Sequence, residues 1–184
     1  MIWFTSDQHF YHKNIIPYCN RPWETVEEMN EGLIQRWNEK VAKKDEVFIL
    51  GDFSFAKPNK TNPILDKLNG VKCLVKGNHD HSTTKWSLHL ATSPHDFSIM
   101  MAPLVGVQFL VSHYPYKPQD PDEDVRYLER RPLDNGDWLL HGHVHKLYKT
   151  RRRMINVGVD VWDYYPVSLS QIMEIINLEK NAQL

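Results

Sequence analysis

Short apolar runs recur along the chain, and each run ends in polar residues or glycine. They occupy positions 2–6, 47–50, 71–75, 107–112, 138–140 and 154–159. Their shortness and their content of β-branched and aromatic residues are typical of β-strands. The pattern therefore predicts six strands, each followed by a polar segment.

Two segments show helical spacing of apolar residues behind a recognisable start. Thr25 with Glu28 forms a capping-box pair, in which each side chain can bond the other residue's backbone amide. Ser168 with Gln171 forms a second such pair. The apolar positions that follow are Val26, Met29, Leu33, Trp37 and Val41 in the first segment and Ile172, Ile175 and Ile176 in the second. Both segments are predicted to be helices.

A third, shorter helix is expected to begin at Asn62-Pro63 and to reach Leu68, with Gly70 just past its end. Strands and helices alternate in the first half of the chain, whereas the second half is richer in strands. A layered α/β sandwich, with two sheets and helices outside them, accommodates both halves.

Composition narrows the class of protein. The chain has 184 residues, 41% of them hydrophobic and 24% charged, which suits one soluble globular domain spanning 1–184. The net charge of −1 provides no global field for nucleic acid or membrane. Cys19 and Cys73 lie far apart, so a disulfide framework is not indicated. No signal peptide or membrane span is evident, and a cytoplasmic location is expected.

Ten histidines are an unusual number for this length. Half of them fall in five polar blocks that follow predicted strands. The blocks are Asp7-Gln8-His9, Gly51-Asp52, Gly77-Asn78-His79-Asp80, Ser112-His113 and Gly142-His143-Val144-His145. Because side chains alternate along extended backbone, the first and last residues of an Asp-x-His or His-x-His triplet can point the same way.

Carboxylates and imidazoles without thiolates form an oxygen and nitrogen site. Such a site suits manganese, iron, zinc, nickel or cobalt rather than a structural zinc clamp. Two adjacent divalent ions would need a shared anionic bridge to offset their repulsion, and a lone Asp between the blocks can provide it. Glycines beside the ligands allow the backbone to come close to the ions or the substrate.

In this order the blocks resemble the calcineurin-like metallophosphoesterase family, in its small single-domain bacterial and phage form. The family pattern is D-x-H, G-D, G-N-H-D/E, H and G-H-x-H, and every element occurs between Asp7 and His145 without substitution. The resemblance implies a four-layer αββα sandwich with two mixed β-sheets. It also implies two divalent metal ions, with manganese as the first choice.

Residue roles follow from the same resemblance. One ion would be held by Asp7, His9, Asp52 and His145, and the other by Asp52, Asn78, His113 and His143. His79 would protonate the leaving group as general acid, and Asp80 would orient the His79 side chain. The implied activity is that of a metal-dependent phosphoric ester hydrolase, in which a hydroxide held by the two ions attacks phosphorus.

The expected partner is a small phosphodiester or phosphomonoester, with nucleotides and cyclic nucleotides included. Long nucleic acid is not expected, because the charge is near neutral and little chain remains after His145 for a further domain. A membrane partner is not indicated, and the sequence does not determine the oligomeric state. Two alternatives stay open: a nuclease of the same family, and a non-catalytic scaffold of the same fold.

Less specific stretches bear on the substrate. His12, Asn14 and Arg21 follow the first block and are candidate substrate contacts, with loop packing as the alternative. Histidines 81, 89, 95 and 141 are expected to be surface or structural residues, although the first of them could line the site. A basic run at 146–153 is interpreted as a solvated hairpin, with a phosphate or nucleic-acid contact as the alternative. An acidic run at 120–124 is interpreted as a mobile loop that could act as a lid. Trp162, Tyr164 and Tyr165 are expected in the core, with stacking on a base or an aryl leaving group as the alternative.

Overall fold

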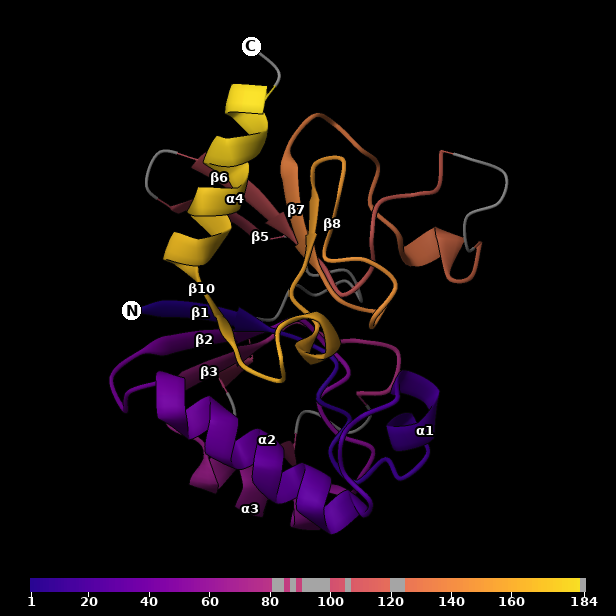
Figure 1. The fold of residues 1–184 in the computed structure, drawn as a ribbon, viewed down its shortest axis with the longest axis vertical. Coiled ribbons are helices and arrows are strands. Elements are labelled where there is room, and N and C mark those ends of the chain that lie inside the picture. Colours follow the sequence, from indigo (N-terminus) through magenta and orange to yellow (C-terminus); the bar gives the residue numbers. More distant parts are fainter. Residues whose placement is uncertain (81–84, 87–88, 91–99, 105–106, 120–124, 183–184) are drawn as a thin grey trace.

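A computed structural model describes residues 1–80, 85–86, 89–90, 100–104, 107–119 and 125–182. Its first sheet has five strands in the order β10-β1-β2-β3-β4 (Figure 1). These strands are β1 Ile2–Thr5, β2 Glu46–Ile49, β3 Val71–Leu74, β4 His89–Leu90 and β10 Val167–Ser168. The strands β1 to β4 run parallel, and β10 is antiparallel to β1.

The second sheet also has five strands, in the order β5-β6-β7-β9-β8. They are β5 Met100–Leu104, β6 Val107–Val111, β7 Trp138–His141, β8 Thr150–Arg151 and β9 Met154–Asn156. The central strands β6, β7 and β9 are parallel, and the outer strands β5 and β8 are antiparallel to their neighbours. Both sheets are therefore mixed, and the predicted α/β sandwich is confirmed.

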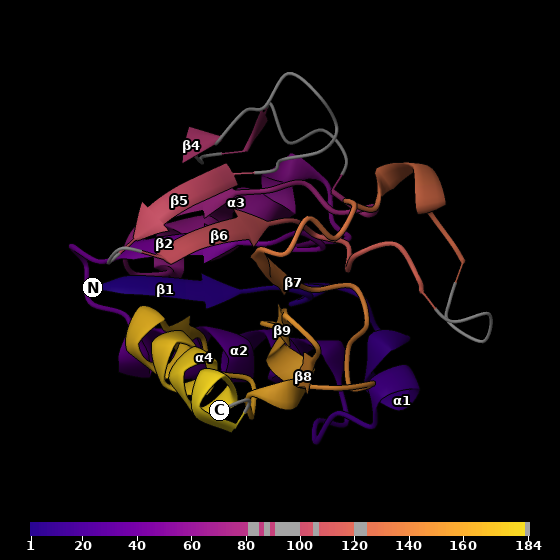
Figure 2. The same ribbon diagram turned by 90° about the horizontal axis from the view of Figure 1, so that it is seen from above.

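Four α-helices of the described residues surround the sheets: α1 Ile15–Cys19, α2 Val26–Lys40, α3 Pro58–Lys67 and α4 Leu169–Ala182. The 3-10 helices η2 Leu128–Arg130 and η3 Val159–Val161 lie in connections. The helices α2 and α3 cover one side of the first sheet, whereas the second sheet and α4 lie on the other side (Figures 1 and 2). No helix in the described part of the chain is long and apolar enough to cross a membrane.

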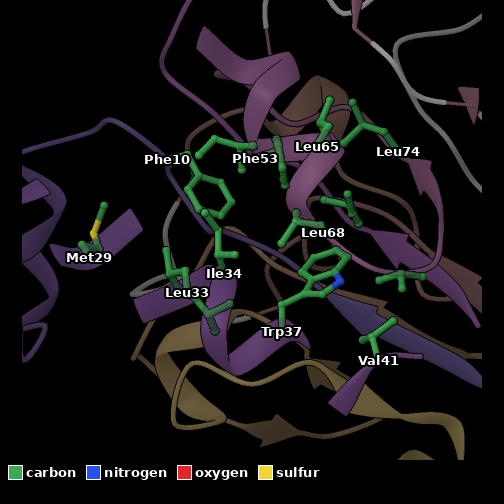
Figure 3. Packing of buried hydrophobic residues seen from close by; sticks show 14 of the residues in the cluster. Phe10, Met29, Leu33, Ile34, Trp37, Val41, Phe53, Leu65, Leu68 and Leu74 are labelled. Carbon is green, nitrogen blue, oxygen red and sulfur yellow. The ribbon is translucent and has the colours of Figure 1, made fainter. Parts of the chain in front are cut away.

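Strand β1 separates two hydrophobic cores because its side chains alternate between faces. Trp3 belongs to the cluster beneath the first sheet, together with Trp37 of α2. Figure 3 shows this cluster, with Leu33 and Trp37 packed near Leu65 and Leu68. Phe4 faces the opposite way, into the cluster that contains strands of the second sheet and Ile176 of α4. The alternation determines which face of β1 packs against α2 and which face packs against the second sheet.

The six predicted strands are present, and both capping boxes form. Glu28 N–H donates to Thr25 Oγ1 at 3.2 Å, and Gln171 N–H donates to Ser168 Oγ at 3.3 Å. The predicted start of α3 was wrong, because the helix begins at Pro58 and contains Pro63. Proline fits the first helical position, where no partner for its missing N–H is needed, so Pro58 is the true start.

The remaining sequence predictions either differ from the structure or concern residues outside its described part. The run at 154–159 is a strand only to Asn156, and Val159 begins η3. The short elements α1, β4, β5, β8 and β10 were not predicted. His81, His95 and the acidic run at 120–124 lie outside the described residues, as does the side chain of His89.

Candidate metal centre

The five polar blocks meet at one edge of the sandwich, where parallel strands of both sheets end. The Asp7 N–H donates to Gly51 O and the His9 N–H to Asp52 O, both at 3.0 Å, which ties the first two blocks together. Ser6 forms a parallel bridge with Gly158, which connects the end of β1 to the segment after β9. The loops of the two sheets are thus joined by backbone contacts at this edge.

Among the described residues, three groups of donor side chains lie at metal-binding separations, and two of these groups consist of predicted ligands. Ligand atoms of Asp7, His9 and His145 all lie within 4.8 Å of one another, and so do those of Asp7, Asp52 and His113. Asp52 Oδ2 lies 3.6 Å from His9 Nε2 and 3.5 Å from His113 Nε2. Asp52 is therefore placed between the two groups, which is the position that a bridging carboxylate requires.

The remaining predicted ligands adjoin the second group. Asn78 Oδ1 lies 3.1 Å from His113 Nε2. The ring of His143 lies 5.1 Å from that of His113, centroid to centroid, and its backbone N–H donates to the Asp7 carboxylate at 3.0 Å. The structure thus brings all seven predicted ligands into one cluster, while the assignment of each to an ion stays a prediction.

Five of these ligands adopt a backbone conformation that L-residues rarely occupy. Their φ angles are 59° at Asp7, 52° at His9, 52° at Asp52, 71° at His143 and 48° at His145. A non-glycine residue in this left-handed region is strained, and such strain concentrates at functional sites. The chain is held in this shape by the backbone bonds between blocks.

Glycines allow the loops to pack directly on the carboxylates. A Cβ added to Gly77 would collide with the Asp52 carboxylate, and one added to Gly142 would collide with Ser6 Oγ and Asp7 Oδ2. Only hydrogen fits at these two positions. The Gly-Asn-His and Gly-His-x-His blocks therefore require their glycines for close approach.

Burial dominates the electrostatics of the cluster. It raises the pKa of Asp7 and raises that of Asp52 to about 6, while it lowers the pKa of His9 and of His113. Neither ring nitrogen of His9 has a hydrogen-bond partner among the described residues. Desolvated carboxylates next to unpartnered imidazole nitrogens suit a bound divalent cation, so the donor set fits a metal.

Asp160 is a functional residue that the sequence did not reveal. Its Oδ2 lies 3.0 Å from His145 Nδ1, so it can fix the orientation of that imidazole. Burial alone would lower the pKa of His145, but the hydrogen bond to Asp160 and the nearby Asp7 carboxylate raise it to about 11. The position of Asp160 shortly after β9, at the same sheet edge as the other blocks, is the signal that could have identified it.

Arg21, a predicted substrate contact, points into the protein, which fits the alternative of loop packing, and its contact with a substrate stays a prediction. Its side chain is 0% exposed, and its Nε and Nη2 bond the two oxygens of Asp160 at 2.8 and 3.0 Å. The guanidinium also donates to the backbone carbonyls of Gln8 and Asp7. All of its donor nitrogens are thus used inside the protein, and Arg21 supports the first ligand loop from beneath.

Asp80 has a supporting position as well. Its carboxylate accepts bonds from the backbone N–H groups of Asp52, Phe53 and Gly77 at 2.7, 2.9 and 2.8 Å. Burial, followed by repulsion from Asp52, raises its pKa to about 6. Asp80 therefore clamps the second and third blocks together, and its predicted action on His79 stays a prediction.

His79 lies at the open side of the cluster. Its side chain is 38% exposed, and its Nε2 lies 3.9 Å from Asp52 Oδ2. The ring of His12 is half-buried nearby, 6.4 Å from the His79 ring. Asn14 is exposed and precedes α1 without a side-chain capping bond. Substrate contact by His12 and Asn14 stays a prediction.

Other residues of interest lie away from the cluster. His141 is fully buried, with Nδ1 2.7 Å from Gly142 O, which agrees with a structural role. The basic run at 146–153 covers the segment before β8, β8 itself and the turn into β9, and Arg153 of this turn pairs with Asp134 at 3.0 Å. Trp162 donates its indole N–H to the Asn156 carbonyl, and it lies partly buried against the second core.

Fold and site together define a phosphoesterase class. Residues 1–165 match the calcineurin-like phosphoesterase superfamily domain, and the chain belongs to that family. It is 36% identical to an uncharacterized protein of Methanocaldococcus jannaschii, over 97% of this chain and 93% of the relative. It is 33% identical to the Gene 66 protein of Mycobacterium phage L5, over 95% and 93%. A crystal structure of a protein of unknown function from Aquifex aeolicus superposes with a TM-score of 0.71 at 30% identity, over 95% of this chain and 98% of that one.

Proposed function

We propose that the protein is a dinuclear-metal-dependent phosphoesterase that hydrolyses a small phosphodiester or phosphomonoester. The observation that supports this most directly is the convergence of Asp7, His9, Asp52, His113 and His145 within metal-binding separations at one sheet edge. The family of the chain supports the reaction class. Manganese is the proposed metal, with iron, zinc, nickel and cobalt as alternatives that the donor set also suits.

Asp7, His9, Asp52 and His145 would hold one ion, and Asp52, Asn78, His113 and His143 the other. Bound there, the ions would supply a nucleophile from water at neutral pH and offset negative charge on the phosphate. His79 is partly exposed beside Asp52, so its imidazole can reach a phosphate ester at the centre and protonate the leaving oxygen. Asp160 holds His145 in place by a bond to Nδ1.

The experiment compares the protein with Asp52→Asn, which weakens the shared carboxylate of both groups. Metal content after purification and hydrolysis of p-nitrophenyl phosphate, its bis ester, and 2′,3′- and 3′,5′-cyclic nucleotides are measured with several divalent metals. We expect about two ions per chain in the unaltered protein, and loss of bound metal and of hydrolysis in Asp52→Asn. Asp66→Asn, at an exposed position of α3, is the matched control.

Each alternative has its own outcome. A non-catalytic scaffold would take up little metal and turn over none of the esters. A nuclease would cut duplex DNA faster than bis(p-nitrophenyl) phosphate. Hydrolysis that persists unchanged in metal-free protein would overturn the proposed function.

A further inference from the structure

One end of the ligand cluster is covered by an aromatic wall at Phe55. The ring of Phe55 stacks on that of His12, with centroids 3.9 Å apart and planes at 13°. It lies 4.5 Å from the His79 ring and 5.8 Å from the His9 ring. Phe55 is nevertheless 45% exposed, and Tyr18, 68% exposed, extends the wall beyond His12. An apolar surface thus adjoins the proposed general acid.

The other end of the cluster carries a second aromatic wall. The rings of Tyr114 and Tyr127 lie 5.0 and 5.5 Å from the ring of His143, and 5.5 Å from each other. Arg130 donates to Tyr114 Oη at 3.5 Å and lies over the Tyr127 ring. Tyr127 holds a left-handed φ of 57°. The backbone is thus constrained at the residue that presents this ring to the site.

The two walls contact different histidines of the site. Phe55 lies against His9 and His79, whereas the tyrosine pair lies against His113 and His143. Tyr114 is buried, so the partly exposed Tyr127 provides the accessible ring of the second wall. A phosphorus atom near Asp52 would therefore have an accessible aromatic ring on each side, Phe55 on one and Tyr127 on the other. A phosphomonoester has only one organic arm and leaves one wall bare, whereas a phosphodiester has two.

We propose that the substrate is a phosphodiester with an aromatic group on each arm, such as a nucleobase, and that Phe55 and Tyr127 determine this specificity. The inference rests on the proposed function. The arm over Phe55 leaves, because His79 lies beside it. Water adds its oxygen to phosphorus, the bond to that arm breaks, and the departing oxygen takes a proton and leaves as an alcohol. The arm over Tyr127 stays on the monoester product.

Binding of phosphinates that cannot be hydrolysed tests the two walls in the absence of turnover. Diphenylphosphinate, methyl(phenyl)phosphinate and dimethylphosphinate are anions with two, one and no aryl arms, and their P–C bonds resist hydrolysis. Their dissociation constants are measured by calorimetry on manganese-loaded protein. Since stacking on an aromatic side chain strengthens binding by about 1 kcal/mol or more, each aryl arm should tighten binding about fivefold or more. In Phe55→Ala or Tyr127→Asn the diphenyl compound should bind only as tightly as the monophenyl one.

Steady-state kinetics test which wall holds the leaving arm of the diester and which holds the retained arm. Bis(p-nitrophenyl) phosphate and methyl p-nitrophenyl phosphate share a leaving group and differ in the retained arm. Their kcat/KM ratio should fall about fivefold in Tyr127→Asn and change less in Phe55→Ala. The control is Tyr165→Leu. The Tyr165 hydroxyl bonds Glu39 of α2, and this variant should keep the ratio of the unaltered protein.

Different results would refute the two-wall proposal and the proposed function. If the three phosphinates bind within twofold of one another while esters are still hydrolysed, the two-wall proposal is wrong and the proposed function stands. The two-wall proposal is equally wrong if p-nitrophenyl phosphate, a monoester, is the best substrate. If the protein binds no metal and hydrolyses no ester, the proposed function itself fails.

Discussion

Replacing Asp160 with asparagine tests how the metal centre is supported. The Asp160 side chain is 1% exposed and serves two cationic or polar partners at once. It accepts hydrogen bonds from Nε and Nη2 of Arg21, and it bonds Nδ1 of His145. Asparagine keeps the size of the side chain but removes its charge, so the fully buried Arg21 guanidinium loses its counterion.

The expected loss of stability follows from the burial of the Arg21–Asp160 ion pair. Removing one member of a buried ion pair costs about 3–5 kcal/mol, because the other charge is left uncompensated. For a protein of this length, each kcal/mol shifts the Tm by about 2–4 °C, so we expect a decrease of roughly 6–20 °C in metal-free protein. Metal affinity should also fall, by about 10–100-fold, because the carboxylate no longer fixes the His145 ring.

Thermal unfolding of metal-free protein and calorimetric titration with Mn²⁺ measure the two effects separately. The matched control is Asp163→Asn, an exposed carboxylate in the same segment, which should change stability by less than about 0.5 kcal/mol. The double variant Arg21→Gln/Asp160→Asn should recover part of the lost stability, since no lone buried charge remains, but none of the metal affinity. A Tm for Asp160→Asn within about two degrees of the control, by the scale above, would refute the reasoning.

Two further predictions concern other carboxylates. Asp80→Ala leaves three backbone amides without their acceptor and should cost about 3 kcal/mol or more in urea unfolding. Asp66→Ala, at an exposed position of α3, should cost little, and equal stability of the two variants would contradict the clamp. Asp45 bonds the N-terminal ammonium and Trp3, which lowers its pKa from 3.8 to about 2. Its contribution to stability is therefore complete above pH 3.8 and lost as pH falls through about 2, and Asp45→Asn should remove this component of acid destabilisation in unfolding curves recorded from about pH 5 to about pH 2.

The sequence predicted the strands and ligand blocks well because both depend on local patterns. A buried parallel strand needs a continuous apolar run, and the run before Asp52 or His113 is readable as such. The elements that were not predicted are short, such as β8 with two residues and α1 with five. Their positions depend on partners distant in the sequence, which local spacing does not encode.

The ion pair of Arg21 could not be predicted for the same reason. A basic residue after the first ligand block fits a phosphate contact as well as a structural ion pair when only the sequence is known. The choice depends on Asp160, which lies 139 positions away in the chain and becomes a neighbour only when the two sheets pack together. Sequence patterns located the predicted ligands, but they could not identify Asp160 and Arg21, which hold His145 and the Asp7 backbone in place.

The backbone conformation of the ligands bears on the choice between an enzyme and a metal-free scaffold. Turns at strand ends that serve structure alone place glycine or asparagine in the left-handed region, where those residues cost little. Here aspartate and histidine occupy that region at five positions, and both glycine and asparagine stand within the same blocks. Tyr11, Arg152, Asp163 and Tyr164 hold the same conformation without being predicted ligands. What sets the five ligand positions apart is that their carboxylates and imidazoles also converge in one cluster. Strain of order 1–3 kcal/mol at each position, combined with this convergence, is expected of a centre that holds metal ions, whereas a scaffold without metal would need neither.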